Sequence, residues 1–501
     1  MRASRATQPA KTKSPARWTV LLAVCALPFA GCAVGPKYRG APPVSTPPAY
    51  KEMGGWKTAQ PNEQNLGGSW WEIFQDPQLN SLEQKINVSN QNLQQAVANY
   101  RQSRATLRYV RADYYPTVTA SPSATRERYS ANRPPPSSIF DGLTFNDYVV
   151  PFNLSYQTNA WGRVSRNVES YRAQAQASAA DLAVINLSMH ASLAVDYFAA
   201  RSLDAEEKLL KDTVAQYEQA YQLNEDLYAG GLASEVEVEQ ARTILETTRA
   251  EMIDVGVARA QYEHAVAVLI GEPPADFTLP ALPLTAPPPP IPVALPSELL
   301  ERRPDIAEAE RQVASANAQI GLAKSSYYPL VSILASGGFE SGSITTLFQG
   351  PSILWSVGPS ALVTLFDFGR RRALNDEAKA GYDSSVASYR QTVLSAFQQV
   401  EDDLASLRIL RQEAEVQATA VQAAQNSLDL SNTRYEGGVT SYLEVITAQN
   451  AALADEVTAV NILGRRMASA VLLIQALGGG WDKNELPNRP ECCGKLISSS
   501  N

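Results

Sequence analysis

The sequence predicts a mainly α-helical protein with a few membrane-type β-strands, built from an internal duplication. Two tracts, 152–272 and 360–486, contain none of the 32 prolines, which is typical of long helices. Segments rich in β-branched and aromatic residues stand between the helical tracts, as expected of strands. Three short motifs occur twice in the same order, so two copies of one unit account for the 501 residues.

Composition excludes several classes of protein. The two histidines, His190 and His264, are far apart and have no set of Cys, Asp or Glu around them at ligand spacing. This leaves little for a zinc site or a His-based catalytic triad. The sequence also contains no phosphate loop and no dinucleotide fingerprint. We therefore expect no enzyme activity, no metal site and no cofactor.

The N-terminus predicts export and lipidation. Residues 1–31 combine five basic residues and no acid with an apolar run from Trp18 to Ala30, the pattern of a secretory signal. Small residues directly before Cys32 make the end of this run similar to a bacterial lipobox, in which the cysteine is acylated. The alternative is a plain signal peptide with an incidental cysteine. Ala33 after the cysteine implies, by resemblance to sorted lipoproteins, an anchor in the outer membrane.

The rest of the chain is acidic and is expected to have no membrane-spanning helix. No later stretch reaches the roughly 20 apolar residues that such a helix needs. Without the signal segment the formal charge is −13, which argues against a nucleic-acid partner. Residues 481–501 are expected to form a polar tail, in which the adjacent Cys492 and Cys493 carry no evident chemistry.

The duplicated motifs divide the chain. Tyr114-Tyr115-Pro116 matches Tyr327-Tyr328-Pro329 at a spacing of 213, and Trp161-Gly162-Arg163 matches Phe368-Gly369-Arg370 at 207. Tyr228 to Gly231 matches Tyr435 to Gly438, also at 207. The predicted repeats are 76–272 and 299–480, joined by a Pro-rich linker, 273–298, and preceded by an extended segment, 32–75.

Each copy predicts the same succession of elements. A helix ends at Tyr-Tyr-Pro, because proline cannot continue it. Strands are expected at about 116–128 and 146–158, and at about 329–339 and 353–366, where Val363 to Phe366 are strand formers. Long helices are expected from about 163 to 228 and from 370 to 435. A Gly-Gly turn then reverses each helix, and a second helix returns to about 270 or 477.

Length and periodicity indicate coiled coils and an oligomer. Seven apolar residues recur every seven positions in the second long helix: Val386, Val393, Val400, Leu407, Ala414, Val421 and Leu428. This spacing keeps one seam against a neighbouring helix. Four strands per chain cannot close a membrane barrel, which needs eight or more, so either a dimer or a trimer would satisfy the count. A water-soluble sheet on a helical bundle is the alternative.

Three motifs resemble those of a known family: Leu299 to Ile306 followed by Ala309-Glu310, Cys32 to Tyr38, and Trp70 to Pro77. Together they are similar to the NodT-type lipoprotein branch of the TolC-like outer-membrane efflux factors, over nearly all of 32–481. The resemblance implies a homotrimer with a twelve-stranded barrel in the outer membrane and a helical tunnel in the periplasm. It implies a passive exit duct, which works with a periplasmic adaptor and an inner-membrane transporter.

The resemblance also implies sites at the two turns. The adaptor would dock at Gly230, Gly231, Gly437, Gly438 and Ser441. These glycines also serve simply to reverse the helices, and both roles are compatible.

An acidic aperture would lie just beyond the second turn, at Glu444 and Thr447, with Glu237 in the equivalent place of the first copy. A carboxylate ring there would favour cations. The alternative for Glu444 is a solvated surface residue. Tyr435 and Glu436 are candidates for contacts that close the gate.

Competing functions remain open at this stage. The nearest is an outer-membrane duct for type I protein secretion, which would use the same turns. A structural lipoprotein without a pore is more distant, and an enzyme is the least consistent with the sequence. The transported substrate is not encoded in any recognisable pattern, although few Met and His residues disfavour a dedicated copper or silver path.

Overall fold

The computed structural model describes residues 33–52, 68–132, 134, 139, 141–293 and 296–487. The predicted signal peptide, Cys32, Cys492 and Cys493 lie outside this described part. The chain forms two compact units, and each takes segments from both halves of the sequence. The first unit contains Ser103–Ala175 and Gln312–Ser385 together with the segment up to Ala41, and the second contains the remaining segments.

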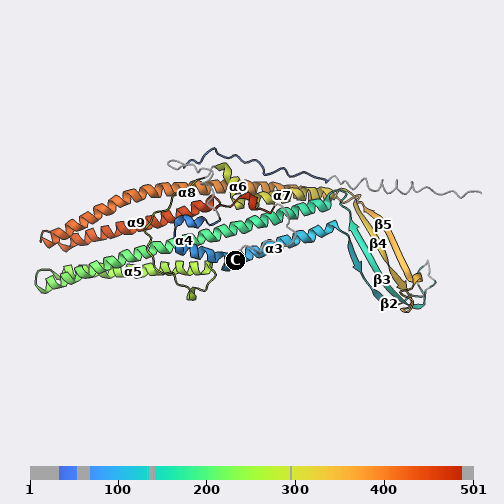
Figure 1. Cartoon of the computed structure of the whole chain (residues 1–501), viewed down its shortest axis with the longest axis horizontal. Coiled ribbons are helices and arrows are strands. Elements are labelled where there is room, and N and C mark those ends of the chain that lie inside the picture. Colours follow the sequence, from blue (N-terminus) through green and yellow to red (C-terminus); the bar gives the residue numbers. More distant parts are fainter. Residues whose placement is uncertain are drawn as a thin grey trace, which may run out of the picture. The chain divides into compact units, whose positions relative to one another are not determined.

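The first unit is built on one antiparallel sheet (Figure 1). Its strands are β1 (Thr117–Ala120), β2 (Ser123–Arg128), β3 (Thr144–Gln157), β4 (Leu330–Ser341) and β5 (Ile353–Leu362). The order is β1-β3-β4-β5, and β2 also pairs with β3. The two halves of the chain therefore meet where β3 pairs with β4, with Val150 opposite Phe339.

The prediction of two strands per copy holds for strand positions but not for every boundary. The first strand is interrupted between β1 and β2, which keep one register against β3. Pro122 in the gap and Pro151 on β3 have no N–H to donate, so the ladder is broken there. The expected strand at 363–366 is wrong. Leu362 already pairs with Leu330, the first residue of β4, so no strand in the described part of the chain lies opposite Val363 to Phe366.

One face of the sheet is apolar and the other is mostly polar. The register places these residues on the apolar face: Tyr148, Val150, Phe152, Leu154 and Tyr156 of β3, Val331, Ile333, Ala335 and Phe339 of β4, and Ile353, Trp355 and Val357 of β5. Ser332 and Ser336 lie on the other face with Ser356 and Ser360. Trp355 and Val357 are 76% and 66% exposed, so the apolar face is not covered by the described part of the chain.

The N-terminal segment is seated against the helices of the first unit. Gly35 approaches Gly321 so closely that a Cβ on Gly35 would stand 2.5 Å from the Gly321 Cα. The Arg166 side chain donates to the carbonyl oxygens of Val34 and Gly35, and Asn317 donates to the carbonyl of Pro36. The close contact between Gly35 and Gly321 therefore leaves no room for a side chain at position 35.

Eight described α-helices carry most of the chain, as the proline-free tracts predict. They are α2 (Pro77–Ser89), α3 (Gln91–Arg111), α4 (Arg163–Ala229), α5 (Glu235–Leu269), α6 (Leu299–Arg302), α7 (Pro304–Ser325), α8 (Arg370–Glu436) and α9 (Tyr442–Ala476). Both α4 and α8 contain 67 residues, or roughly 100 Å of helix at 1.5 Å per residue. In the second unit α5 runs back along α4 and α9 along α8, as the Arg249–Glu218 and Gln417–Asp455 contacts show (Figure 1).

The predicted heptad seam on α8 is confirmed by burial. Val393, Val400 and Leu407 are buried, and the other four predicted seam positions are partly buried. A second set at the same spacing is also buried: Tyr389, Ala396, Leu410, Ala424 and Ser431. The two sets alternate at three and four residues, which is the pattern of a coiled-coil seam.

Two helices are more apolar than the sequence analysis allowed. Among the described residues, α4 and α9 each contain an 18-residue window with a mean hydropathy of 1.3 and 1.4, of which 33% is buried. By length and composition alone these windows could cross a membrane, so the expectation that no later stretch qualifies is wrong by this criterion. Only a third of each window is buried, so both windows also contain apolar residues that the described part of the chain leaves uncovered.

Buried polar pairs fix the second unit. Asp76 caps α2 by accepting from the backbone N–H of Gln78 and Leu79, and the Tyr197 hydroxyl donates to its other oxygen at 2.6 Å. The Nδ1 atom of His190 lies 2.6 Å from Glu83, and the ring stacks on Trp71 with centroids 4.4 Å apart. The Trp-Trp motif therefore covers a buried histidine–carboxyl pair.

Candidate functional site

The two Gly-Gly turns, 229–235 and 436–442, have the same backbone geometry and are called the tip turns below. Gly231 and Gly438 adopt positive φ values of 73° and 69°. The next residue in each turn, Leu232 or Val439, donates its N–H back to the carbonyl five residues earlier. This is the Schellman ending of a helix, and the left-handed position favours glycine.

Glu237 is occupied as a helix cap in the first tip turn. Its carboxylate accepts from the backbone N–H of Ser234 at 2.8 Å, and the two residues form a complete capping box at the start of α5. A capping box satisfies two backbone donors that the helix leaves open. Glu237, which the sequence predicts at the aperture, therefore caps the N-terminus of α5 in the described structure.

Glu444 has different partners although it occupies the equivalent place in the second copy. Its carboxylate accepts from Arg434 at 2.8 Å and from the Thr440 hydroxyl, and Ser441 makes no side-chain cap. The position equivalent to Arg434 in the first copy is Leu227, which offers no charge. Because the arginine competes for the carboxylate, the second tip turn has an ion pair where the first has a cap.

The ion pair is accessible to solvent. The side chains of Arg434 and Glu444 are 54% and 39% exposed. Thr447 lies one turn further along α9 and is also exposed, with its hydroxyl bonded to the carbonyl of Leu443. Glu444 and Thr447 are three residues apart, so they share one face of α9. Solvent and ions can therefore reach both side chains in a single chain.

Tyr435 joins the two helical hairpins just above the tip turns. Its hydroxyl lies 2.9 Å from Oδ1 of Asn224 on α4, and its ring centroid is 5.3 Å from that of Tyr442. Asn224 is fully buried and donates to the carbonyl of Ala220. Glu436, the other candidate for gate closure, is exposed. Of the two, only Tyr435 bridges α8 and α4.

A groove of about 580 Å³ lies between α5 and α9 beside the tip turns. Its lining combines the apolar residues Val236, Ile244, Leu443 and Ile446 with polar side chains that include Glu235 and Glu239. Val236 and Leu443 are 63% and 55% exposed. An exposed apolar surface with a polar rim is typical of a protein-binding site.

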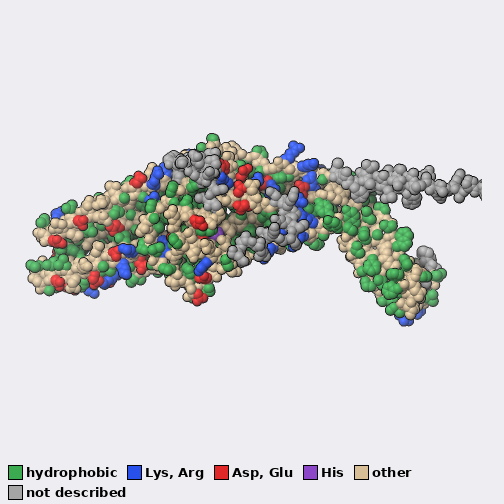
Figure 2. Space-filling model, in the orientation of Figure 1, with side chains coloured by type: hydrophobic (Ala, Val, Ile, Leu, Met, Phe, Trp, Pro, Cys, Tyr) green, Lys and Arg blue, Asp and Glu red, His purple; other side chains and the backbone are tan. Residues whose placement is uncertain are grey.

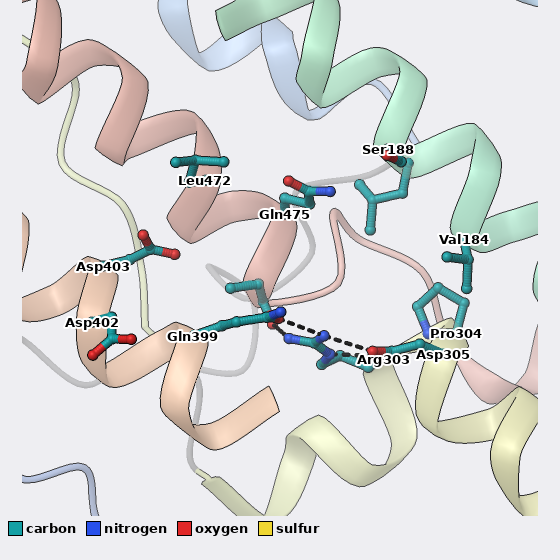
Figure 3. A pocket seen from close by; sticks show the side chains of 12 residues that line it. Val184, Ser188, Arg303, Pro304, Asp305, Gln399, Asp402, Asp403, Leu472 and Gln475 are labelled. Atoms are coloured by element: carbon teal, nitrogen blue, oxygen red, sulfur yellow. Dashed lines mark hydrogen bonds and ion pairs between the residues drawn. The ribbon is translucent and has the colours of Figure 1, made fainter. Parts of the chain in front are cut away.

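Arg303, from the motif that opens the second repeat, is a structural anchor (Figure 3). It is buried and donates to both oxygens of Asp305, to Gln399 on α8 and to the carbonyl of Ala476 at the end of α9. A cavity of about 440 Å³ beside it is lined by Asp402 and Asp403. Burial, and next the charge of Asp402, raise the pKa of Asp403 to about 7, although Arg303 opposes the shift.

The amphipathic sheet and the paired long helices define a class of protein: outer-membrane channels that extend through helical hairpins. The chain belongs to the outer membrane efflux protein family, whose model matches residues 82–272 and 295–479. The resemblance inferred from the sequence motifs is thereby confirmed.

Individual relatives agree with this assignment. The chain is 33% identical over 472 residues to the antibiotic efflux pump outer membrane protein ArpC of Pseudomonas putida, covering 92% of this chain and 95% of that protein. It is 29% identical over 468 residues to the cation efflux system protein CusC of Escherichia coli O6:H1, covering 92% and 99%. The solved outer-membrane channel OprN matches with a TM-score of 0.83 and 28% identity, covering 90% of this chain and 100% of that one.

Two partners at the tip turns are not predicted from the sequence. Arg434 bonds to Glu444, and Asn224 bonds to Tyr435. One signal was present, since the first copy has Leu227 where the second has Arg434, so a base stands ten residues before the glutamate only in the second copy. A base that faces an acid across the turn in one copy alone indicates an ion pair there.

Proposed function

We propose that the protein is the outer-membrane exit duct of a tripartite efflux pump. The observation that carries this proposal is the sheet with one uncovered apolar face, joined to long helical hairpins in a chain of the efflux family. The duct is passive, catalyses no reaction and receives its substrate from an inner-membrane transporter. A secretion duct is not favoured, because the relatives with this similarity are named as efflux components.

Three chains supply the membrane part. Four strand positions per chain give twelve in a trimer, and a closed ring leaves no strand edge in lipid. The apolar face points to the lipid and the polar face to the lumen, which is the alternation of membrane barrels. The helices of the two repeats, 76–272 and 299–480, continue the duct into the periplasm.

Lipidation fixes the N-terminus to the same membrane. We assign the acyl group to Cys32, which directly precedes the seated segment that begins at Ala33. Several acyl chains together give stable anchoring, since each buried CH₂ contributes about 0.8 kcal/mol.

The tip turns are the docking site for the periplasmic adaptor. Gly230, Gly231, Gly437, Gly438 and Ser441 form the exposed reversals, and the apolar groove between α5 and α9 opens beside them. A helical hairpin of the adaptor would place apolar residues in this groove. The carboxylates of Glu235 and Glu239 in its lining favour basic residues at the edges of that hairpin.

Glu444 and Thr447 line the aperture in this proposal, with Arg434 as the partner that limits its charge. While the Arg434 ion pair persists, each chain adds little net charge to the aperture. Separation of the pair would leave three carboxylates around the axis and favour cations. Glu237 contributes less, because its carboxylate is used as a helix cap.

Conductance of the purified protein in planar bilayers tests the proposal. We expect a small, weakly selective current that becomes cation-selective in Arg434→Gln and shifts toward anions in Glu444→Gln, where Arg434 is left without its carboxylate. Glu246→Gln, which neutralises an exposed acid on α5 away from the tip turns, is the matched control and should match wild type. Selectivity that is the same in all four proteins would remove Glu444 from the aperture. Absence of current from a stable trimer would contradict the duct itself.

A further inference from the structure

The junction between helices and sheet in the first unit is unusually basic. Its segments are 33–41, 103–116, 158–175, 321–329 and 363–372. They contain twelve Lys or Arg but only three acids, Asp113, Glu169 and Asp367, in a chain whose formal net charge is −8. Figure 2 shows Lys and Arg side chains gathered where the helices meet the strands.

Two of the three acids in these segments are paired with arginines of the same segments, so the junction keeps an excess of positive charge. Arg166 binds Glu169 at 2.8 Å, and Arg371 binds Asp367 at 2.6 Å. The basic collar is defined here by the six exposed bases that remain at the helix ends and on the N-terminal segment: Lys37, Arg39, Arg108, Arg163, Arg370 and Arg372. Within the described part of the chain Arg108, Arg163 and Arg370 form no ion pair, and Arg372 has only a weak contact of 3.9 Å with Asp376.

The strand register places all four junctions at one end of the sheet. Thr117 at the start of β1 lies opposite Ser155, close to the end of β3. Gln157 lies opposite Ser332, and Leu330 lies opposite Leu362 at the end of β5. At the other end of the sheet, the connecting segments 129–143 and 342–352 contain one Arg and one Asp. Arg126 and Arg128 lie near that end on β2, but Glu127, Asp147 and Glu340 accompany them on the strands, so an excess of positive charge is found at the helical end.

Exposed aromatic side chains lie at the same end. Tyr115, Phe366 and Phe368 are 73%, 75% and 92% exposed. Trp161 donates to the carbonyl of Pro329 and stacks on Tyr328. The Arg371 guanidinium lies over the Tyr327 ring, 5.6 Å from its centroid. Rings of this kind are typical of the depth at which lipid headgroups meet water.

We propose that the basic collar binds the headgroups of anionic phospholipids in the periplasmic leaflet of the outer membrane. This inference rests on the proposed function, because the strands must cross that membrane for the collar to meet the leaflet. Arginines in the first turns of α4 and α8 stand at the positive ends of the helix dipoles, with no acid in either first turn. Asp367, just before α8, accepts from the backbone N–H of Gly369 and Arg371 and pairs with the Arg371 side chain, which leaves Arg163, Arg370 and Arg372 for an external anion. A phosphate headgroup at this depth supplies the anion, and the aromatic rings contact its acyl region.

The test measures lipid binding by the detergent-solubilised full-length trimer with native mass spectrometry. The collar variant carries Arg108→Gln, Arg163→Gln, Arg370→Gln and Arg372→Gln. The control variant carries Lys208→Gln, Lys211→Gln, Arg411→Gln and Arg465→Gln, four exposed bases of the second unit. The probes are phosphatidylglycerol, phosphatidylcholine and soluble glycerol phosphate. A base near an anionic surface contributes about 1 kcal/mol, or about fivefold in affinity.

We expect the collar variant to lose at least fivefold in phosphatidylglycerol affinity, and the control variant and phosphatidylcholine binding to be unchanged. Added salt should weaken the wild-type interaction, because exposed charges are screened. Equal binding by both variants would overturn the proposal. Glycerol phosphate that competes as well as the lipid would also overturn it, in favour of a free-anion site. If the fourfold variant does not form trimers, the pair Arg163→Gln and Arg370→Gln decides by the same criteria.

The lipid-binding proposal and the duct proposal are contradicted by different results. A collar variant that still conducts in neutral phosphatidylcholine bilayers but no longer retains phosphatidylglycerol separates lipid binding from the channel. A wild-type trimer that binds phosphatidylglycerol but conducts no current would contradict the duct and leave the collar standing.

Discussion

Replacement of Glu83 by Gln tests whether the buried pair with His190 is neutral. Glu83 is 0% exposed, and one of its oxygens has no hydrogen-bond partner. Burial raises the pKa of Glu83 to about 9 and lowers the pKa of His190 to about 4. Both shifts favour a protonated carboxyl that donates to Nδ1 of a neutral ring, while the other ring nitrogen donates to Asn87.

The neutral pair makes a quantitative prediction. Because the side-chain amide of a glutamine can also donate to Nδ1 of His190, Glu83→Gln should change the free energy of unfolding by less than about 1 kcal/mol per protomer near pH 4.5, and the variant should be the more stable protein at higher pH, where wild type loses stability. An ion pair would behave differently, since removal of one partner leaves a buried unpaired charge at a cost of about 3–5 kcal/mol. Thermal unfolding of the trimer, followed by circular dichroism, distinguishes the two, with the exposed Glu246→Gln as control.

The pH dependence of stability gives an independent check. Between pH 6.5 and 9 the folded state keeps a proton on Glu83 that the unfolded state releases. Stability should therefore fall by about 1.4 kcal/mol per pH unit as the pH rises. Between pH 4 and 4.5 stability should instead rise with pH, because His190 is protonated in the unfolded state but neutral in the folded state. From pH 4.5 to 6.5 the contributions of Glu83 and His190 cancel. Glu83→Gln should abolish the alkaline slope. A variant that is strongly destabilised at pH 7 and retains the slope would refute the neutral pair.

Three further predictions concern the tip turns and the anchor of the second repeat. Tyr435→Phe removes the bond to Asn224 and should weaken the link between α8 and α4 by about 1 kcal/mol, seen as a higher open probability in bilayers; an unchanged open probability would remove Tyr435 from the gate. Gly438→Ala places a Cβ at positive φ and should cost about 1–2 kcal/mol in thermal stability, whereas Gly437→Ala should be much milder; equal effects would contradict the Schellman geometry. Arg303→Lys loses the forked bonds to three segments and should lower the melting temperature of the trimer clearly; an unchanged melting temperature would show that the buried fork contributes nothing.

The sequence predicted helix ends better than strand ends and side-chain partners. Proline and the Gly-Gly pairs end helices for local reasons, so α4 and α8 were predicted to within one residue or so at both ends. The end of β5 depends instead on where β4 begins, which strand propensity at Val363 does not encode. The partner of Glu444 depends on a residue across the turn, and the Ser-x-x-Glu pattern alone predicts a capping box in both copies.

The open edges of the sheet have a consequence for assembly. In one chain the outer edges are formed by β1 with β2 on one side and by β5 on the other, and these edges differ in length and sequence. A ring is therefore closed by a head-to-tail contact, in which each chain offers one edge and receives the other. A chain with one damaged edge can still join a neighbour through its intact edge but blocks closure. When such a chain is expressed together with wild type, we expect its defect to be dominant, because one chain with a damaged edge prevents the ring from closing.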